Sequence, residues 1–212
     1  PELGDLPPSV FIPIAEEAHL IGALGDWVLK RACTEAMSWP GSVRIAVNVS
    51  AVQFANAGFS SLVAQALAHS GLPPERLELE LTESIFLGDE GATTDMFNQL
   101  KLLGVRLALD DFGTGYSSLS YLQHAPFDKI KIDKSFIRGV TQEGNRNAAI
   151  ITSIVSLAKA LGMDTTAEGI EAHDELDAMR ALGVGQIQGY IYAVPVPPED
   201  VCEAMTSGEW VI

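Results

Sequence analysis

The chain has 212 residues, of which 47% are hydrophobic and 19% are charged, a composition that supports one domain with a packed core. Its formal net charge of -15 argues against a general binder of nucleic acid or of anionic membranes, so a phosphate ligand would need local cations or metal ions. The two cysteines, Cys33 and Cys202, lack metal-ligand spacing and fit a reducing, cytoplasmic setting. Charges and glycines interrupt every long apolar stretch, so we expect no membrane contact by this domain.

The first half of the chain predicts an alternation of helices and strands. The first forty residues hold one or two helices, and a strand with valine and isoleucine in period two covers 43–50. A helix over 59–71 ends at Gly71, and a strand follows over 76–83. A helix around 93–103 is then stopped by Gly104.

The second half continues the same alternation. A strand over 105–111 precedes a helix in the sequence SSLSYLQH, and the next strand covers 127–133. A long helix over 146–162 is followed by a short strand within 163–171. The last two predicted elements are a helix over 173–183 and a strand over 184–192.

Six strands that alternate with helices predict an α/β fold with parallel pairing. A doubly wound sheet and a TIM-type (β/α) barrel both satisfy this pattern. The early strand-to-helix turns contain neither a GxGxxG nor a Walker A glycine pattern. The absence of these glycine patterns weakens the interpretation as a doubly wound nucleotide-binding sheet and favours the barrel.

Polar residues occupy one face of several predicted strands, near the C-terminal end of each. They are Asn48, Glu80, Asp110 and Lys131, and the opposite faces carry valine, leucine or isoleucine. In a barrel such residues converge at the mouth where barrel enzymes place their chemistry. The amide and carboxylate oxygens are ligands suited to Mg²⁺ or Mn²⁺, and the adjacent Asp110 and Asp111 suit two neighbouring ions in a phosphoryl reaction.

Each of these residues also has a simpler interpretation when it is taken alone. Asn48 suits a turn or cap, Glu80 a solvated edge strand, and Lys131 the protein surface. Asp110 and Asp111 suit caps of the next helix, and the glycines of 113–115 suit a plain turn. Because five such coincidences fall at matching strand ends, we favour a shared site.

The motifs around these positions resemble those of the EAL domain family, the phosphodiesterases specific for cyclic di-GMP. The matching segments cover nearly the whole chain, in the same order and spacing: NVS (48–50), ELTES (80–84), DDFGTGYSSL (110–119), KIDKSFI (131–137), AEGIE (167–171) and QGY (188–190). The resemblance implies one domain over 1–212 with a modified TIM-type barrel. It also implies hydrolysis of cyclic di-GMP to linear pGpG with two Mg²⁺ or Mn²⁺ ions.

The resemblance implies a metal-binding role for five residues. Asn48, Glu80 and Asp110 would bind the first ion, and Asp110 and Asp111 would bind or bridge to the second. Glu168 would act beside the ions, either as a ligand or as the base towards the attacking water.

Further roles follow from the same resemblance. Lys131 would hold the attacking water and offset charge near the scissile phosphate, and Gln188 would contact the substrate. Glu83 and Glu171 match the acids that steady the glycine-containing loop after the paired aspartates. Asp133 also matches a family position. The four histidines match no ligand position of the family: His19, His69, His124 and His173.

The Glu-Ala-Leu motif that names the family is absent from this sequence. In the family it precedes a segment similar to PELGDLPPSVFIPIAEE, which here begins at Pro1. We therefore expect N-terminal truncation: a barrel without its first strands, with unpaired strand edges and without one glutamate ligand. The parent protein is expected to carry the motif, and this exact chain is expected to be impaired in hydrolysis.

Three hypotheses for the function remain open at this point. The first is an active phosphodiesterase, the second a catalytically inactive cyclic di-GMP receptor, and the third a structural interaction partner. The retained polar residues favour the first. The resemblance also implies a homodimer and a sensory or GGDEF domain in the parent chain, which is cytoplasmic or membrane-anchored.

Overall fold

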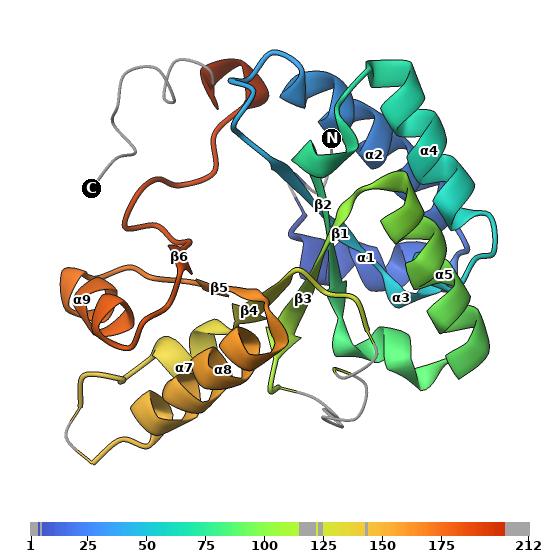
Figure 1. Cartoon of the computed structure of the whole chain (residues 1–212). Coiled ribbons are helices and arrows are strands. Elements are labelled where there is room, and N and C mark those ends of the chain that lie inside the picture. Colours follow the sequence, from blue (N-terminus) through green and yellow to red (C-terminus); the bar gives the residue numbers. More distant parts are fainter. Residues whose placement is uncertain (1–3, 5, 115–121, 123–124, 143, 202–212) are drawn as a thin grey trace. The chain divides into compact units, whose positions relative to one another are not determined.

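The computed structural model of the chain describes residues 4, 6–114, 122, 125–142 and 144–201 (Figure 1). They divide into two compact units. The first comprises Pro1–Leu79 and Ile85–Val105, and the second comprises Glu80–Ser84 and Arg106–Ile212. Strand β2 (Leu77–Thr82) and the short 3-10 helix η2 (Glu83–Leu87) cross the boundary between them.

The first unit is mostly helical. Its elements are α1 (Pro8–Glu17), α2 (Ile21–Ala36), β1 (Ile45–Val49), α3 (Ala51–Phe54), α4 (Phe59–Ser70), η1 (Pro74–Arg76) and α5 (Glu90–Leu103). Helices α4 and α5 end where the sequence predicts, because Gly71 and Gly104 adopt the left-handed conformation with φ of 75° and 87°. Helix α5 begins earlier than predicted, since the Asp89 side chain accepts a hydrogen bond from Ala92 N and caps it.

Aromatic packing and one buried arginine hold the first unit together. The ring of Phe97 packs against that of Phe54 at a tilted angle of 56°, with ring centroids 5.1 Å apart. The guanidinium of Arg76 donates to backbone carbonyl oxygens before β1, including those of Ala36 at 2.7 Å and Val43 at 2.8 Å. A cation that satisfies carbonyls at the end of α2 fixes the chain as it leaves that helix.

The thiol of Cys33 is expected to resist alkylation in the folded protein. The residue is completely buried in α2, and burial raises its pKa to about 11, so almost no thiolate exists at pH 8. Iodoacetamide labelling followed by peptide mapping should leave Cys33 unmodified in native buffer and label it fully in denaturant. Labelling of Cys33 at equal rates in the two conditions would contradict its burial.

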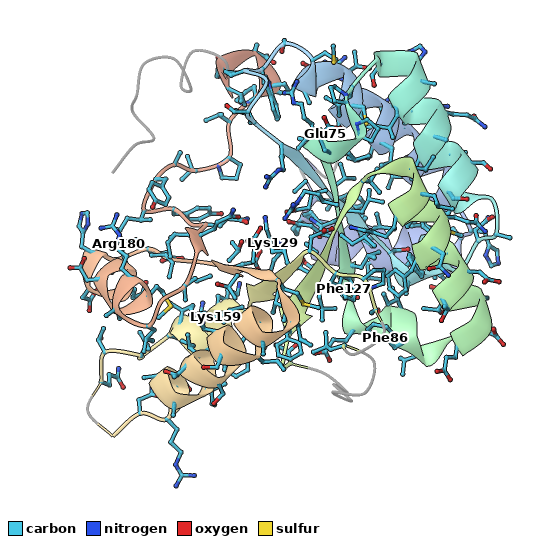
Figure 2. All side chains as sticks on the ribbon, in the orientation of Figure 1. Glu75, Phe86, Phe127, Lys129, Lys159 and Arg180 are labelled. Carbon is cyan, nitrogen blue, oxygen red and sulfur yellow. The ribbon has the colours of Figure 1, made fainter. Side chains whose placement is uncertain are left out.

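The second unit carries strands β3 to β6 and helices α7 to α9. They are β3 (Arg106–Phe112), β4 (Lys129–Ile132), α7 (Lys134–Ile137), α8 (Asn147–Leu161), β5 (Asp164–Ala167), α9 (His173–Ala181) and β6 (Gln186–Ile187). Helix α8 contacts β4 and β5, and apolar side chains fill the space between them (Figure 2). Ile130 and Ile132 are fully buried there, as are Ile151 and Ala158 on the helix.

The six strands form one sheet in the order β1-β2-β3-β4-β5-β6. The pairs β3–β4, β4–β5 and β5–β6 are parallel. A doubly wound sheet reverses its strand order at a switch point, whereas a (β/α) barrel adds strands in chain order. The sequential order therefore confirms the prediction of a TIM-type α/β fold.

The last predicted strand differs most from the structure. The last strand is only Gln186–Ile187, because residues 188–192 turn back onto the segment after β5: Ile170 N donates to Gln188 O and Ile191 N donates to Ile170 O. The short helices α3 and α7 were not predicted. The helix expected in SSLSYLQH falls almost entirely outside the described residues. Among the described residues, no helix has the length and apolarity required to cross a membrane.

Candidate active site

A β-bulge brings the two adjacent aspartates to the same place on the sheet. Leu109 pairs with Ile130 and Phe112 pairs with Ile132, so Asp110 and Asp111 together oppose the single residue between the two isoleucines. Asp111 adopts a left-handed conformation with φ of 54°, which aspartate tolerates better than most residues. The bulge breaks the alternation of the strand and allows both carboxylates to reach one site.

Lys131 lies opposite this bulge and forms ion pairs with three carboxylates. Its Nζ is 2.8 Å from Glu80 Oε2, 3.2 Å from Asp110 Oδ1 and 2.5 Å from Glu168 Oε1. The Lys131 side chain is only 4% exposed and that of Glu80 only 7%. The surface interpretations of both residues are therefore wrong, and the predicted convergence of Glu80, Asp110 and Lys131 is confirmed.

The buried charges shift one another's titration. Burial alone would lower the pKa of Lys131, but Glu80, Asp110 and the hydrogen bond to Glu168 raise it well above its usual range. Burial raises the pKa of Glu168, and Lys131 opposes this shift. Burial also raises the pKa of Asp111, and the negative charge of Asp110 adds to it. The site thus holds more negative charge than its one ammonium satisfies.

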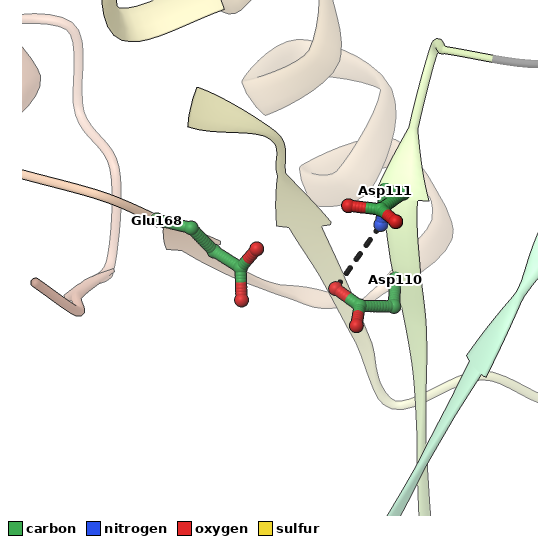
Figure 3. A group of neighbouring side chains, drawn as sticks. All are labelled: Asp110, Asp111 and Glu168. Atoms are coloured by element: carbon green, nitrogen blue, oxygen red, sulfur yellow. Dashed lines mark hydrogen bonds between the residues drawn. The ribbon is translucent and has the colours of Figure 1, made fainter. Parts of the chain in front are cut away.

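Three of these acids form a group that could hold a metal ion. One carboxylate oxygen from each of Asp110, Asp111 and Glu168 lies within 4.8 Å of the others (Figure 3). Asp110 Oδ1 also accepts a hydrogen bond from Asp111 N at 3.1 Å, which orients its carboxylate. With Glu80 included, the group has four carboxylates, of which Lys131 forms ion pairs with three. This surplus of hard oxygen donors fits a divalent cation such as Mg²⁺ or Mn²⁺.

Glu83 contacts the chain just after the paired aspartates. Its Oε1 accepts a hydrogen bond from Gly113 N at 2.9 Å. Gly113 has φ of 92°, and the ring of Phe136 lies so close that an added Cβ would be 3.0 Å from it. This geometry is consistent with the predicted role of Glu83 in steadying the loop.

A cavity of about 360 Å³ opens beside the acids. Residues that sequence reasoning singled out line it, namely Asp111, Asp133, Glu168, Glu171 and Gln188. The Asp133 carboxylate accepts from Ser135 N and caps α7. Its pKa is lowered: burial acts in the other direction, but the hydrogen bonds from Ser135 and Lys134 prevail.

The same cavity is lined by residues that the sequence analysis missed: Lys134, Gly169, Gly189 and Tyr190. They belong to the KIDK, AEGIE and QGY segments, so their proximity to predicted residues was the available signal. Asn48 lies in β1 of the first unit, exposed and next to buried valines. Its role as a metal ligand stays a prediction.

A protein-family comparison fits this site and fold. The family model described as EAL domain matches residues 1–195. The chain belongs to the EAL domain family. The family prediction made from the motifs is thus confirmed.

Proteins similar to this EAL domain include bacterial signalling proteins. An uncharacterized signaling protein of Caulobacter vibrioides is 46% identical over 99% of this chain and 26% of its own length. The bifunctional diguanylate cyclase/cyclic di-GMP phosphodiesterase MucR of Pseudomonas aeruginosa is 39% identical over 95% of this chain and 30% of its own length. This EAL domain therefore spans less than a third of either relative.

A solved structure with the same fold contains a bound dinucleotide. It is the PaMucR phosphodiesterase in complex with c-di-GMP, with a TM-score of 0.87 and 40% sequence identity. The similarity covers 92% of this EAL domain and 87% of that chain.

Proposed function

We propose that this EAL domain hydrolyses cyclic di-GMP to linear pGpG with Mg²⁺ or Mn²⁺, using two ions. The observation that carries the proposal is the buried group in which one ammonium serves three carboxylates, beside a fourth, at the C-terminal ends of parallel strands. The names of MucR and of its solved complex support the choice of substrate.

Metal binding and charge compensation would fall to different residues of this chain. Asn48, Glu80, Asp110, Asp111 and Glu168 would hold the ions. When bound, the ions would offset the charge of the phosphate and make water a better nucleophile. Lys131 would keep three of the acids in place and supply a fixed positive charge close to the scissile phosphate.

Other residues would act on the substrate side of the site. Gln188, which lines the cavity, would contact the dinucleotide. Glu83 would hold the loop through Gly113 N, and Glu171, an exposed residue on the cavity wall, would support it. Glu168 would accept a proton from the attacking water if it is not itself a ligand.

The surroundings of the domain are also part of this proposal. We place residues 1–212 in one cytoplasmic EAL domain that forms a homodimer within a longer signalling protein. A GGDEF domain is the favoured neighbour, because the relative MucR is named as a diguanylate cyclase as well as a phosphodiesterase. A sensory domain is the other expected neighbour.

Turnover of cyclic di-GMP with Mg²⁺, Mn²⁺ or chelator tests the proposal, with products separated by chromatography. Two proteins should be compared: this chain, and the longer parent protein in which we place it. Metal-dependent pGpG from the parent protein is expected. Binding of the nucleotide without product from either protein would instead support a receptor, and absence of binding by both would exclude both functions.

The variant Asp110→Asn is expected to weaken Mn²⁺ binding at least about tenfold, because it removes a charged oxygen ligand from the centre of the acidic group. Isothermal titration calorimetry measures the change. Asp164→Asn is the matched control, since Asp164 pairs with Arg106 on the same sheet and its side chain is 55% exposed. Equal Mn²⁺ affinity in the two variants would exclude Asp110 as a ligand.

A further inference from the structure

The cavity beside the metal-binding acids is strongly acidic. Four carboxylates line it, from Asp111, Asp133, Glu168 and Glu171. Among its described lining residues, Lys134 carries the only formal positive charge. A dianionic nucleotide that enters this cavity therefore meets repulsion everywhere except at bound metal ions and at Lys134.

Lys131 cannot serve the rest of the nucleotide. Its ammonium is shared among Glu80, Asp110 and Glu168, and its side chain is 4% exposed. Lys134, in contrast, is exposed: its charge acts to lower the pKa of Asp111 and of Asp133, but among the described residues no carboxylate forms an ion pair with its ammonium within 4.0 Å. Its ammonium is available to a ligand in a way that the ammonium of Lys131 is not.

The backbone makes room for the stem of Lys134. Gly169 has φ of 66°, and an added Cβ there would lie 2.7 Å from the Cβ of Lys134. Because Gly169 has no side chain, the Cβ of Lys134 can pack against the backbone of the segment that carries Glu168. Asp133 fixes the other side, because its carboxylate accepts from Ser135 N and caps the turn in which Lys134 lies.

We propose that Lys134 binds the second phosphate of cyclic di-GMP, the one that is not cleaved, and thereby sets the affinity for a cyclic dinucleotide. This inference rests on the proposed function. Cyclic di-GMP carries two phosphodiesters with one negative charge each. The acidic group with its ions acts on one of them, and the other needs a positive charge elsewhere in the cavity. An ammonium on a flexible stem suits an exposed phosphate oxygen.

Steady-state kinetics of Lys134→Met test the inference, in the parent protein with cyclic di-GMP as substrate. Methionine keeps an apolar stem above Gly169 and removes the charge. KM is expected to rise about tenfold while kcat changes less than about threefold, because the lost contact serves binding rather than the reacting phosphate. Lys134→Arg should restore KM to within about threefold of the wild type.

Lys159→Met is the matched control, because Lys159 is an exposed lysine in the last turn of α8 (labelled in Figure 2) and does not line the cavity. It removes the same net charge and should leave KM unchanged. The dependence of kcat/KM on ionic strength should be weaker in Lys134→Met than in the control.

Each outcome decides between the two ideas. Wild-type kinetics in Lys134→Met, or an equal change in the control, would overturn the role of Lys134 and leave the phosphodiesterase intact. A loss of kcat without a change in KM would place Lys134 at the reacting phosphate and also overturn the inference. A wild type that neither binds nor cleaves cyclic di-GMP would overturn both.

Discussion

Lys131→Met is expected to lower kcat for cyclic di-GMP by about 10²–10³-fold, since a fixed positive charge beside the reacting phosphate is lost. The same change should destabilise the metal-free protein by about 3–5 kcal/mol, the usual effect of removing one partner from a buried ion pair. Without the ammonium, Glu80, Asp110 and Glu168 repel one another in a largely buried place. Part of this cost should disappear if the acids become protonated.

Thermal unfolding with and without Mn²⁺ measures the second effect. Mn²⁺ should raise Tm more in Lys131→Met than in the wild type, because the ion then supplies charge that the ammonium no longer supplies. Lys159→Met, at an exposed site, is expected to match the wild type in both kcat and Tm. An unchanged Tm in metal-free Lys131→Met would show that the three carboxylates do not depend on this lysine.

Gly189→Ala is expected to cost about 3 kcal/mol or more in the free energy of unfolding, since overpacking against backbone cannot be relieved by a rotamer change. The added Cβ would lie 2.1 Å from Ile170 O and 2.4 Å from Ile170 N. These backbone atoms also form the hydrogen bonds that hold the segment of Gln188 beside β5. The variant should therefore lose affinity for cyclic di-GMP together with stability.

Chemical denaturation and calorimetric binding of the dinucleotide measure these two losses. Gly185→Ala is the matched control, because its Cβ would meet its nearest neighbour, Thr165 O, at an ordinary 3.4 Å. The control should stay within about 1 kcal/mol of the wild type. Comparable stability in the two variants would mean that the close approach at Gly189 relaxes easily.

The sequence was sufficient to predict the fold class and most elements, because hydrophobic period and glycine stops report directly on buried faces and helix ends. Gly71, Gly104 and Gly162 end three helices as predicted. The last strand was predicted too long, because Gly189, Ile170 and Ile191 set a turn through tertiary backbone contacts. Contacts of that kind leave no periodic signal in the chain.

The site was predictable where its residues follow strand parity. Glu80, Asp110 and Lys131 converge because alternate residues of parallel strands share a face. Parity also places Asp111 on the opposite face from Asp110, so its place in the site was predicted from its adjacency to Asp110 and from the motif resemblance, not from parity. The bulge and the φ of 54° at Asp111 explain how it reaches the other acids. Lys134 escaped notice because its position depends on the glycine across from it.

The bulge in β3 has a consequence for how such a site is gained or lost in evolution. Leu107 and Leu109 are buried before the bulge, and Phe112 is buried after it. The alternation of side chains along the strand therefore shifts by one residue at the bulge. A single-codon deletion at Asp110 or Asp111 would restore a regular strand with the same apolar face and remove one acid. One deletion is therefore expected to remove an acid while the apolar face of β3 stays intact.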